Sequence, residues 1–217
     1  MKTDAQIQLD VIAELQYLPT LNSKNIGVSV QDGIVTLMST VESYFEKKHA
    51  EKATEDVSGV RGIAMEIEVQ LSEKSKRSDS EIAHAIDQIL TWNALLPQKS
   101  IHVKVEKGWV TIEGDVRFYH QKEMLNASIT HLIGVAGIRN HLEIKNEISK
   151  ADVKSDIVKA LHRGASKDAS NITVTVQNGV VTLSGVVHSW HERSLIKNAA
   201  WYNPNVVSVI DNTVMSI

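Results

Sequence analysis

Histidine is the residue type that most readily suggests chemistry in this chain, because nine are present. His188 and His191 lie three residues apart, a spacing that places two imidazoles on one face of a helix. A zinc site usually needs three or four ligands with a second shell of hydrogen-bonding partners. The equivalent positions in two related segments hold other residues: Glu42 with Phe45, and Arg117 with His120. We therefore expect no metal site, and we interpret the pair as exposed histidines where a helix begins.

Paired carboxylates are the second candidate for chemistry, for example Glu46 with Glu51 and Glu55 with Asp56. Acid–base catalysis by two carboxyl groups needs an environment that separates their pKa values, whereas these pairs fall on a helix face that we expect to be exposed to solvent. The chain has no cysteine, which excludes thiolate zinc sites and cysteine nucleophiles. It also lacks a glycine-rich phosphate loop, a nucleophile elbow and an HExxH motif. We expect a protein that is not an enzyme and that carries no cofactor.

A threefold internal repeat positions all of these side chains. A glycine-tipped segment recurs at 26–37, 101–112 and 172–183, with Gly33, Gly108 and Gly179 at the same place in each copy. The register holds without gaps over 7–69, 82–144 and 153–215, so the length differences fall in the linkers. The repeat predicts three modules, at 1–70, 78–145 and 149–217.

Each copy contains the same order of elements, αββαβ. Aliphatic residues at helical spacing predict a first helix, for which Asp4 and Asp79 are the expected N-caps in copies one and two. Asp32-Gly33 and Asn178-Gly179 are strong signals for a two-residue hairpin turn, and Lys107-Gly108 is a weaker one. Such a turn pairs valines across each hairpin toward the core: Val30 with Val35, Val105 with Val110, and Val176 with Val181. A second helix is predicted near 43–57, 118–132 and 189–202, and a last strand at 63–69, 138–144 and 209–215.

These elements predict an α+β fold of three tandem modules, each a three-stranded mixed sheet with two helices on one face. A domain of ~60 residues buries only ~60% of its unfolded surface, so we expect the modules to pack against one another. Ile34, Trp109 and Val180 occupy equivalent positions on the sheet face opposite the helices. They are the expected contact for this module–module packing.

The element order, the string Gly179-Val-Val-Thr-Leu-Ser-Gly185 and the closing segment 134–144 resemble the BON domain, named after bacterial osmotically inducible and nodulation proteins. Copy one departs from the pattern, with Ser39 where the other copies have glycine. The resemblance implies a non-enzymatic protein that binds phospholipid surfaces or partner proteins, with a role in osmotic stress or in the envelope and transport.

Aromatic side chains divide by position in the repeat. Tyr44, Tyr119 and Trp190 are equivalent residues where the second helix starts, and we expect a structural role for them. Trp201 and Tyr202 align with residues expected to be exposed. This pair is either an interface anchor for a lipid or a partner, or it packs against a neighbouring module.

Charge is unevenly distributed, with −5 over residues 1–75, 0 over 76–147 and +2 over 148–217. The first helix of the third copy is basic, which favours anionic phospholipid or an acidic protein as partner. The expected contact residues are Lys154, Lys159, Arg163, Trp201 and Tyr202. The alternative is a cytoplasmic module that self-assembles without a lipid ligand.

Two further expectations concern partners and compartment. The net charge of −3 and the lack of an aromatic stacking platform argue against nucleic-acid binding. No stretch approaches the ~18 apolar residues of a transmembrane helix. If Met1 is the native start the protein is expected in the cytoplasm, and if a signal peptide has been removed it is expected in the periplasm.

Overall fold

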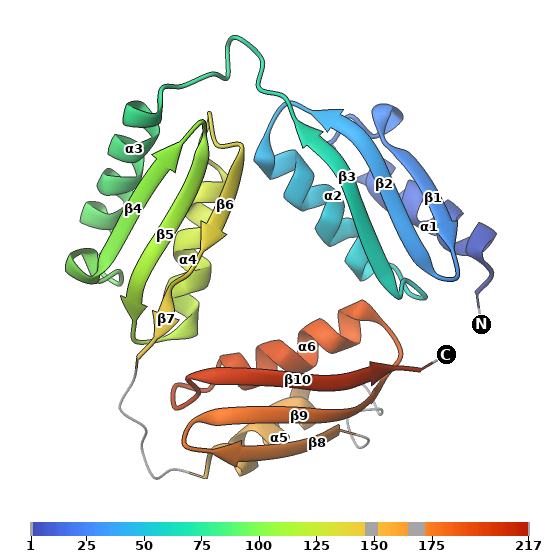
Figure 1. The fold of residues 1–217 in the computed structure, drawn as a ribbon. Coiled ribbons are helices and arrows are strands. Elements are labelled where there is room, and N and C mark those ends of the chain that lie inside the picture. Colours follow the sequence, from blue (N-terminus) through green and yellow to red (C-terminus); the bar gives the residue numbers. More distant parts are fainter. Residues whose placement is uncertain (1, 146–151, 165–171, 217) are drawn as a thin grey trace.

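The computed structural model describes residues 2–145, 152–164 and 172–216, apart from the side chains of 162–164 (Figure 1). Three modules repeat the predicted αββαβ order. The elements of the first module are α1 (Asp4–Tyr17), β1 (Gly27–Gln31), β2 (Ile34–Val41), α2 (Tyr44–Asp56) and β3 (Gly62–Val69). Those of the second are α3 (Asp79–Trp92), β4 (Ile101–Glu106), β5 (Trp109–Val116), α4 (Tyr119–Thr130), β6 (Gly137–Asn140) and β7 (Glu143–Ile144). Those of the third are α5 (Val153–Gly164), β8 (Ile172–Gln177), β9 (Val180–Val187), α6 (Trp190–Trp201) and β10 (Ser208–Met215).

Each sheet is mixed, as predicted. The two hairpin strands are antiparallel, and the last strand of the module pairs in parallel with the second, giving the orders β1-β2-β3, β4-β5-β6 and β10-β9-β8. Both helices of a module lie on the same face of its sheet (Figure 1). The α+β fold class is therefore confirmed.

The hairpin turns confirm the register that the Asp-Gly, Lys-Gly and Asn-Gly pairs predict. Asp32, Lys107 and Asn178 have φ of 51°, 52° and 49°, and the glycine after each is also in the left-handed region. Two consecutive residues with positive φ define the turn whose twist suits a two-residue hairpin. The predicted valine pairs all form, Val30 with Val35, Val105 with Val110 and Val176 with Val181.

Each module has a core of its own between sheet and helices. The central strand provides the most deeply buried aliphatic side chains, with Leu37, Ile112 and Leu183 at 0% exposure. In the first module the second helix contributes small residues that let it lie close to the sheet, including Ala50 and Thr54. The strand ladders therefore face inward, as the alternation of apolar residues predicts.

The expectation that Asp4 and Asp79 are the N-caps of the first helices is wrong by one residue. Thr3 and Ser78 are the N-caps of α1 and α3, each in a reciprocal capping box. The next residue, Asp4 or Asp79, instead extends its carboxylate to the hairpin turn of its own module. The two oxygens of Asp79 accept the N–H groups of Lys107 and Gly108 at 2.8 Å each, and Asp4 does the same at 2.9 Å for Asp32 and Gly33. This aspartate ties the start of the first helix to the turn.

The last strand of the second module is also interrupted, although the sequence predicts a continuous strand over 138–144. It divides into β6 and β7, which both pair with β5. Between them, the side-chain oxygen of Asn140 accepts the N–H of Leu142 at 3.1 Å. A side-chain turn of this kind competes with the ladder, and it directs Leu142 into the core, where it is 3% exposed.

The modules are arranged as a triangle (Figure 1). The second helices α2, α4 and α6 and the edge strands β3, β6 and β10 border its middle, while α1, α3 and α5 lie farther out. No helix in the described ranges is long and apolar enough to cross a membrane.

The aspartate contact leads to a stability prediction. Asp79→Ala removes a charged acceptor from two backbone N–H groups and should lower the free energy of unfolding by about 1–2 kcal/mol. Asp79→Asn keeps one acceptor oxygen and should lose less. Urea denaturation measures both, with exposed Ser80→Ala as the control; an Asp79→Ala loss equal to that of the control would contradict the role of the contact.

Candidate functional site at the junctions between modules

The first residue of each second helix reaches into a neighbouring module. Tyr44 packs against the core of the second module, Tyr119 stacks on Trp201 of the third, and Trp190 packs against the core of the first. We call these contacts the first, second and third junction. Because the third returns to the first module, the three close a ring. The structural role expected for these aromatics is confirmed, and it lies between modules.

Local sequence fixes where each aromatic residue stands. Ser43 and Ser189 are N-caps whose hydroxyls accept the N–H of Glu46 and Glu192. In the second module Phe118 occupies the N-cap position, and the side chain of Gln121 accepts its backbone N–H at 3.0 Å. These caps define the first helical residue, and with it the direction of its side chain.

The first junction joins an aromatic pair to a strand edge. Tyr44 receives a hydrogen bond from the backbone of Ile138 in β6, and its burial raises the pKa of the hydroxyl. The ring of Phe45 lies 4.6 Å from that of His131, just past the end of α4, and 3.8 Å from that of His49. Two imidazoles therefore approach one another across a phenyl ring. Burial, together with the charge of His131, lowers the pKa of His49.

The second junction is built from aromatic rings. Tyr119 and Trp201 are stacked, with centroids 4.6 Å apart and planes 13° apart, and Tyr119 meets Tyr202 edge-on at 6.5 Å. Burial raises the pKa of the Tyr119 hydroxyl, and the nearby carboxylate of Glu123 raises it further. That hydroxyl therefore stays protonated and donates to Glu123.

The third junction combines an apolar contact with an ion pair. Beside Trp190, the Nδ1 atom of His191 lies 3.0 Å from a carboxylate oxygen of Asp56, which also accepts from Lys52 at 2.9 Å. Burial raises the pKa of Asp56, but the hydrogen bonds from His191 and Lys52 outweigh it and leave that pKa below its ordinary value. Arg193 lies over the Trp190 ring at 5.3 Å.

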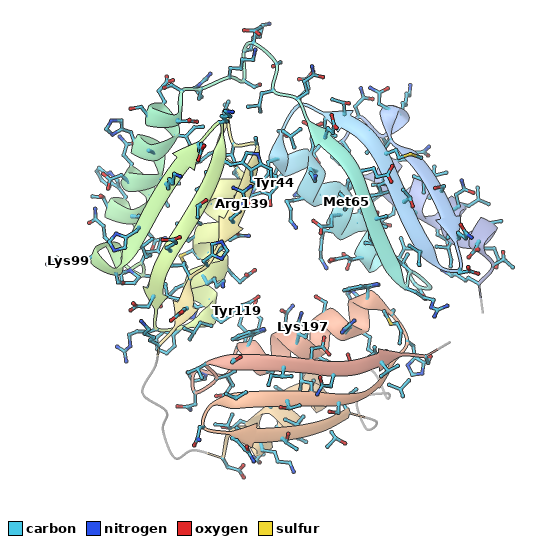
Figure 2. All side chains as sticks on the ribbon, viewed as in Figure 1. Tyr44, Met65, Lys99, Tyr119, Arg139 and Lys197 are labelled. Carbon is cyan, nitrogen blue, oxygen red and sulfur yellow. The ribbon has the colours of Figure 1, made fainter. Side chains whose placement is uncertain are left out.

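A cavity of about 350 Å³ lies where the three second helices meet. Figure 2 shows Tyr119 and Lys197 at the middle of the triangle. The cavity is also lined by Lys52, Glu55 and Glu123, so both signs of charge are present. Burial raises the pKa of Glu55, which corrects the expectation that this carboxylate lies on a fully solvated face.

Within the described ranges, no three histidine or carboxylate side chains lie close enough together to hold a metal ion. His188 lies just before the N-cap of α6 and contacts Glu192 in the first turn of that helix, whereas His191 lies within the helix and contacts Asp56. The two imidazoles suspected from their spacing thus have different carboxylate partners.

The residues predicted for lipid or partner binding are only partly brought together. Lys154 and Lys159 are exposed on α5, while the side chain of Arg163 lies outside the described residues. Trp201 packs against a neighbouring module, one of the two roles weighed from the sequence. Tyr202 is 66% exposed. Binding of a lipid or a partner by these five residues stays a prediction.

The residues predicted for module packing lie on the open sheet faces. Ile34 is 50% and Trp109 41% exposed, and Val180 is half-buried at the equivalent position. The Trp109 ring lies over Gly137, with the guanidinium of Arg139 at 4.5 Å. The junctions described above use other residues, so docking through Ile34, Trp109 and Val180 remains a prediction.

Ring closure is tested by removing one junction aromatic. Trp190→Ala should lower the free energy of unfolding by about 2–3 kcal/mol, less than the ~3–5 kcal/mol of a fully buried tryptophan, and should increase the radius of gyration measured by X-ray scattering. The matched control is Trp92→Ala, which removes an 86% exposed tryptophan from α3 and should change neither quantity. An unchanged radius for Trp190→Ala would contradict closure by this residue.

The first junction should weaken in acid. Since the pKa of His49 is lower in the folded chain than its ordinary value of 6.5, the unfolded chain binds more protons just below pH 6.5, and stability falls there as pH decreases. His131→Gln removes the neighbouring charge and should make the melting temperature depend less on pH between 7.5 and 5.5. His84→Gln, exposed on α3, should leave the dependence unchanged. Identical slopes for the two variants would refute the prediction.

Comparison with known proteins gives one family and a few relatives. The BON domain model matches three times, at residues 3–70, 78–146 and 149–216. Osmotically-inducible protein Y of Escherichia coli (strain K12) is 25% identical over 146 residues, which cover 65% of this chain and 73% of that protein.

Two solved structures also match, both of CdsD, a structural protein of the type III secretion system of Chlamydia trachomatis. One covers 96% of this chain and 91% of its own, and the other covers 100% of each; both are 16% identical, with TM-scores of 0.27 and 0.26. Scores this low carry no structural argument. The three family matches together span nearly the whole sequence, and this chain therefore belongs to the BON domain family.

Proposed function

We propose that the chain is a non-catalytic binding and scaffolding protein whose third module binds anionic phospholipid surfaces. One observation carries this proposal: of the three equivalent outer helices, α5 is the one that contains lysines, and its basic residues outnumber its single acidic residue, Asp156. Lys154 and Lys159 both face solvent on it. Each basic residue near an anionic membrane contributes about 1 kcal/mol of attraction.

The other outer helices carry the opposite charge, which supports an oriented approach. The acidic side chains of α1 are Asp4, Asp10 and Glu14, and those of α3 are Asp79, Glu81 and Asp87. Because the three outer helices lie at the periphery of the triangle (Figure 1), an anionic surface would attract the α5 side and repel the other two.

A role in osmotic stress or in the envelope rests on family membership. The relative in Escherichia coli is named for osmotic induction, and we propose a related role for this chain. The non-catalytic part of the proposal is supported by the junctions, where titratable groups pair with one another or with backbone. Asp56 pairs with His191, and Tyr119 with Glu123.

The second candidate function is self-assembly into a scaffold without a lipid ligand. It is favoured by apolar side chains on the open sheet faces: Ile34 and Trp109 are substantially exposed in the first and second modules, and Val180 is half-buried in the third. Exposed apolar groups of this kind are candidates for contact between copies of the chain. This candidate predicts concentration-dependent assembly that persists in high salt, whereas attraction to lipid weakens with salt.

Vesicle binding distinguishes the two candidates. Phosphatidylglycerol vesicles should sediment the wild-type chain at low salt, and Lys154→Glu with Lys159→Glu should weaken binding about tenfold or more. The control is Lys24→Glu with Lys99→Glu, an equal charge change at two equivalent exposed positions of the other modules. No sedimentation of the wild type, or equal weakening by the control pair, would reject the lipid proposal.

A further inference from the structure

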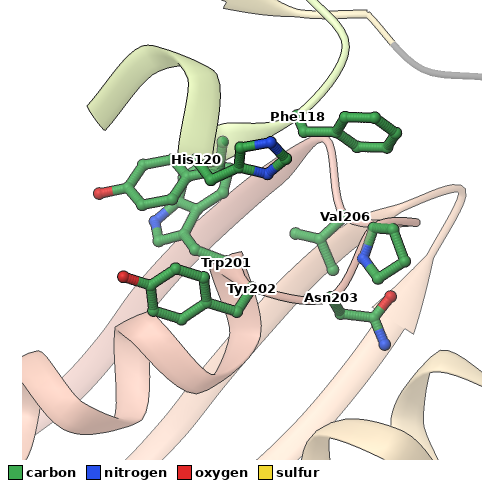
Figure 3. Close-up of a pocket in the computed structure, with 8 residues that line it drawn as sticks. Phe118, His120, Trp201, Tyr202, Asn203 and Val206 are labelled. Carbon is green, nitrogen blue, oxygen red and sulfur yellow. The ribbon is translucent and has the colours of Figure 1, made fainter. Parts of the chain in front are cut away.

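Each sheet has one edge toward the junctions and one edge on the outside of the triangle. Figure 3 shows how closely two modules meet on the inside, with Phe118 and His120 of the second beside Trp201 and Tyr202 of the third. The outer edge strands are β1, β4 and β8, each paired in the described ranges with its hairpin partner alone (Figure 1). Unless something covers it, an edge strand offers a row of unpaired N–H and C=O groups to another extended chain.

The hairpin register shows which backbone groups of β8 point outward. In a two-residue turn the residues before and after the turn share hydrogen bonds, and bonded pairs then alternate along the ladder. The pair next to the turn of β8 and β9 is Gln177 with Val180. Thr175 therefore also faces β9, whereas Val174 and Val176 turn their N–H and C=O groups outward. No described residue forms a hydrogen bond with these outward groups.

The first and second modules protect the equivalent edges, each in its own way. On α1, the side-chain amide of Gln8 donates to the outward carbonyl of Val28 at 2.7 Å. On β4, Lys104 and Glu106 are exposed and pair at 3.1 Å, and charged side chains on an edge strand discourage pairing with another chain. The strand β8 has neither protection. Its sequence, Ile-Thr-Val-Thr-Val-Gln, is uncharged, and the position of Gln8 is held by Lys154.

The charge at this edge selects the partner. Because α5 lies against β8 as α1 lies against β1, Lys154 stands at the outer edge, as Gln8 does in the first module. Lys154 is exposed, and no described carboxylate pairs with it. Antiparallel pairing of two β8 strands would bring two Lys154 side chains together, and such like-charge contacts are unfavourable. An acidic chain brings the opposite charge to the same place.

We propose that β8 accepts an extended acidic segment of a partner protein as a fourth strand of the third sheet. Main-chain hydrogen bonds to Val174 and Val176 hold this strand, and its side chains alternate between the two faces of the sheet. Its carboxylates lie on the helix side, where they meet Lys154. Uncharged side chains lie on the open face beside Thr173 and Thr175. This partner is a protein and is distinct from the phospholipid surface proposed above.

Hydrogen exchange of backbone amides in the full chain tests the proposal. The probe is an acetylated hexapeptide amide of alternating glutamate and valine, and the control peptide has lysine in place of glutamate. At ten times its dissociation constant, the glutamate peptide should slow exchange at Ile172, Val174 and Val176 by about tenfold. Thr173 and Thr175 already face β9 and should be unchanged. The lysine peptide should slow none of these amides.

The repeat supplies the variants. Lys154→Gln introduces the residue with which α1 covers its edge; it removes the charge and should weaken peptide binding by about tenfold or more. Val176→Pro removes an outward N–H, a position at which an edge strand tolerates proline, and should weaken binding similarly. Val105→Pro makes the same change on β4 and should bind the peptide as the wild type does. Val176→Pro keeps Lys154 and Lys159, so it should still sediment with anionic vesicles.

Four results would overturn the proposal. One is unchanged exchange at the outward amides of β8 with the glutamate peptide in millimolar excess, in a chain whose spectrum shows it folded. Equal protection by the lysine peptide would reject an acidic partner. Protection of the same amides in the chain alone, increasing with its concentration, would assign the edge to a second copy. Full binding by both Lys154→Gln and Val176→Pro would place the peptide on another surface.

Discussion

Each module of this chain has a small core of its own, and one aromatic side chain from each module adds to the apolar surface buried in a neighbour. A unit of about 70 residues with a three-stranded sheet leaves a large fraction of its surface exposed. Tyr44, Tyr119 and Trp190 extend the burial across module boundaries. Each contact joins two different surfaces, and head-to-tail contacts of this kind end only when a ring closes. Three modules close it here.

Closure explains why equivalent positions have diverged without loss of the fold. The ring needs a large side chain at the first position of each second helix, and it is less demanding at the next position. There the chain has Phe45, which contacts His131, His191, which contacts Asp56, and His120, which stacks on Phe118 of its own module. The result is an aromatic–imidazole contact between modules, a ring stack within one module and an ion pair between modules at three related places. Differences in the pKa of the junction side chains can therefore arise within one architecture.

The fold within each module could be predicted from the sequence, because it depends on local and periodic signals. Turn pairs such as Asp32-Gly33 determine the hairpin register, and alternation of apolar residues determines which face is buried. The errors occur where one side chain can serve two purposes. Asp79 is as suited to an N-cap as Ser78, and only the nearness of the turn of β4 and β5 shows which contact it makes. Asn140 similarly interrupts a strand through a bond that alternation does not encode.

The junctions could be predicted only in part. Recurrence of an aromatic residue at 44, 119 and 190 indicated a shared structural role, but not the partner. Glu55 and Asp56 belong to a charged helix segment that by itself indicates exposure. In the structure Glu55 is partly buried in the cavity between the second helices, and Asp56 pairs with His191 of the third module. Such contacts depend on how modules are oriented, which no spacing within a module records. Aligning the three copies shows that Phe45 and His191 are equivalent, as are His131 and Asp56, but it does not show that these two positions meet across a junction.

The ring is tested most directly by distances between all three modules in solution. The chain has no cysteine, so spin labels can be attached at chosen positions, and Glu66, His141 and Asn212 are exposed equivalents, one in each module. Spin-labelled cysteine pairs at these positions, two at a time, should give three narrow distance distributions in pulsed electron paramagnetic resonance. Their mean distances should agree with the structure. Broad distributions, or a pair of modules far more distant than the other two pairs, would contradict a closed ring.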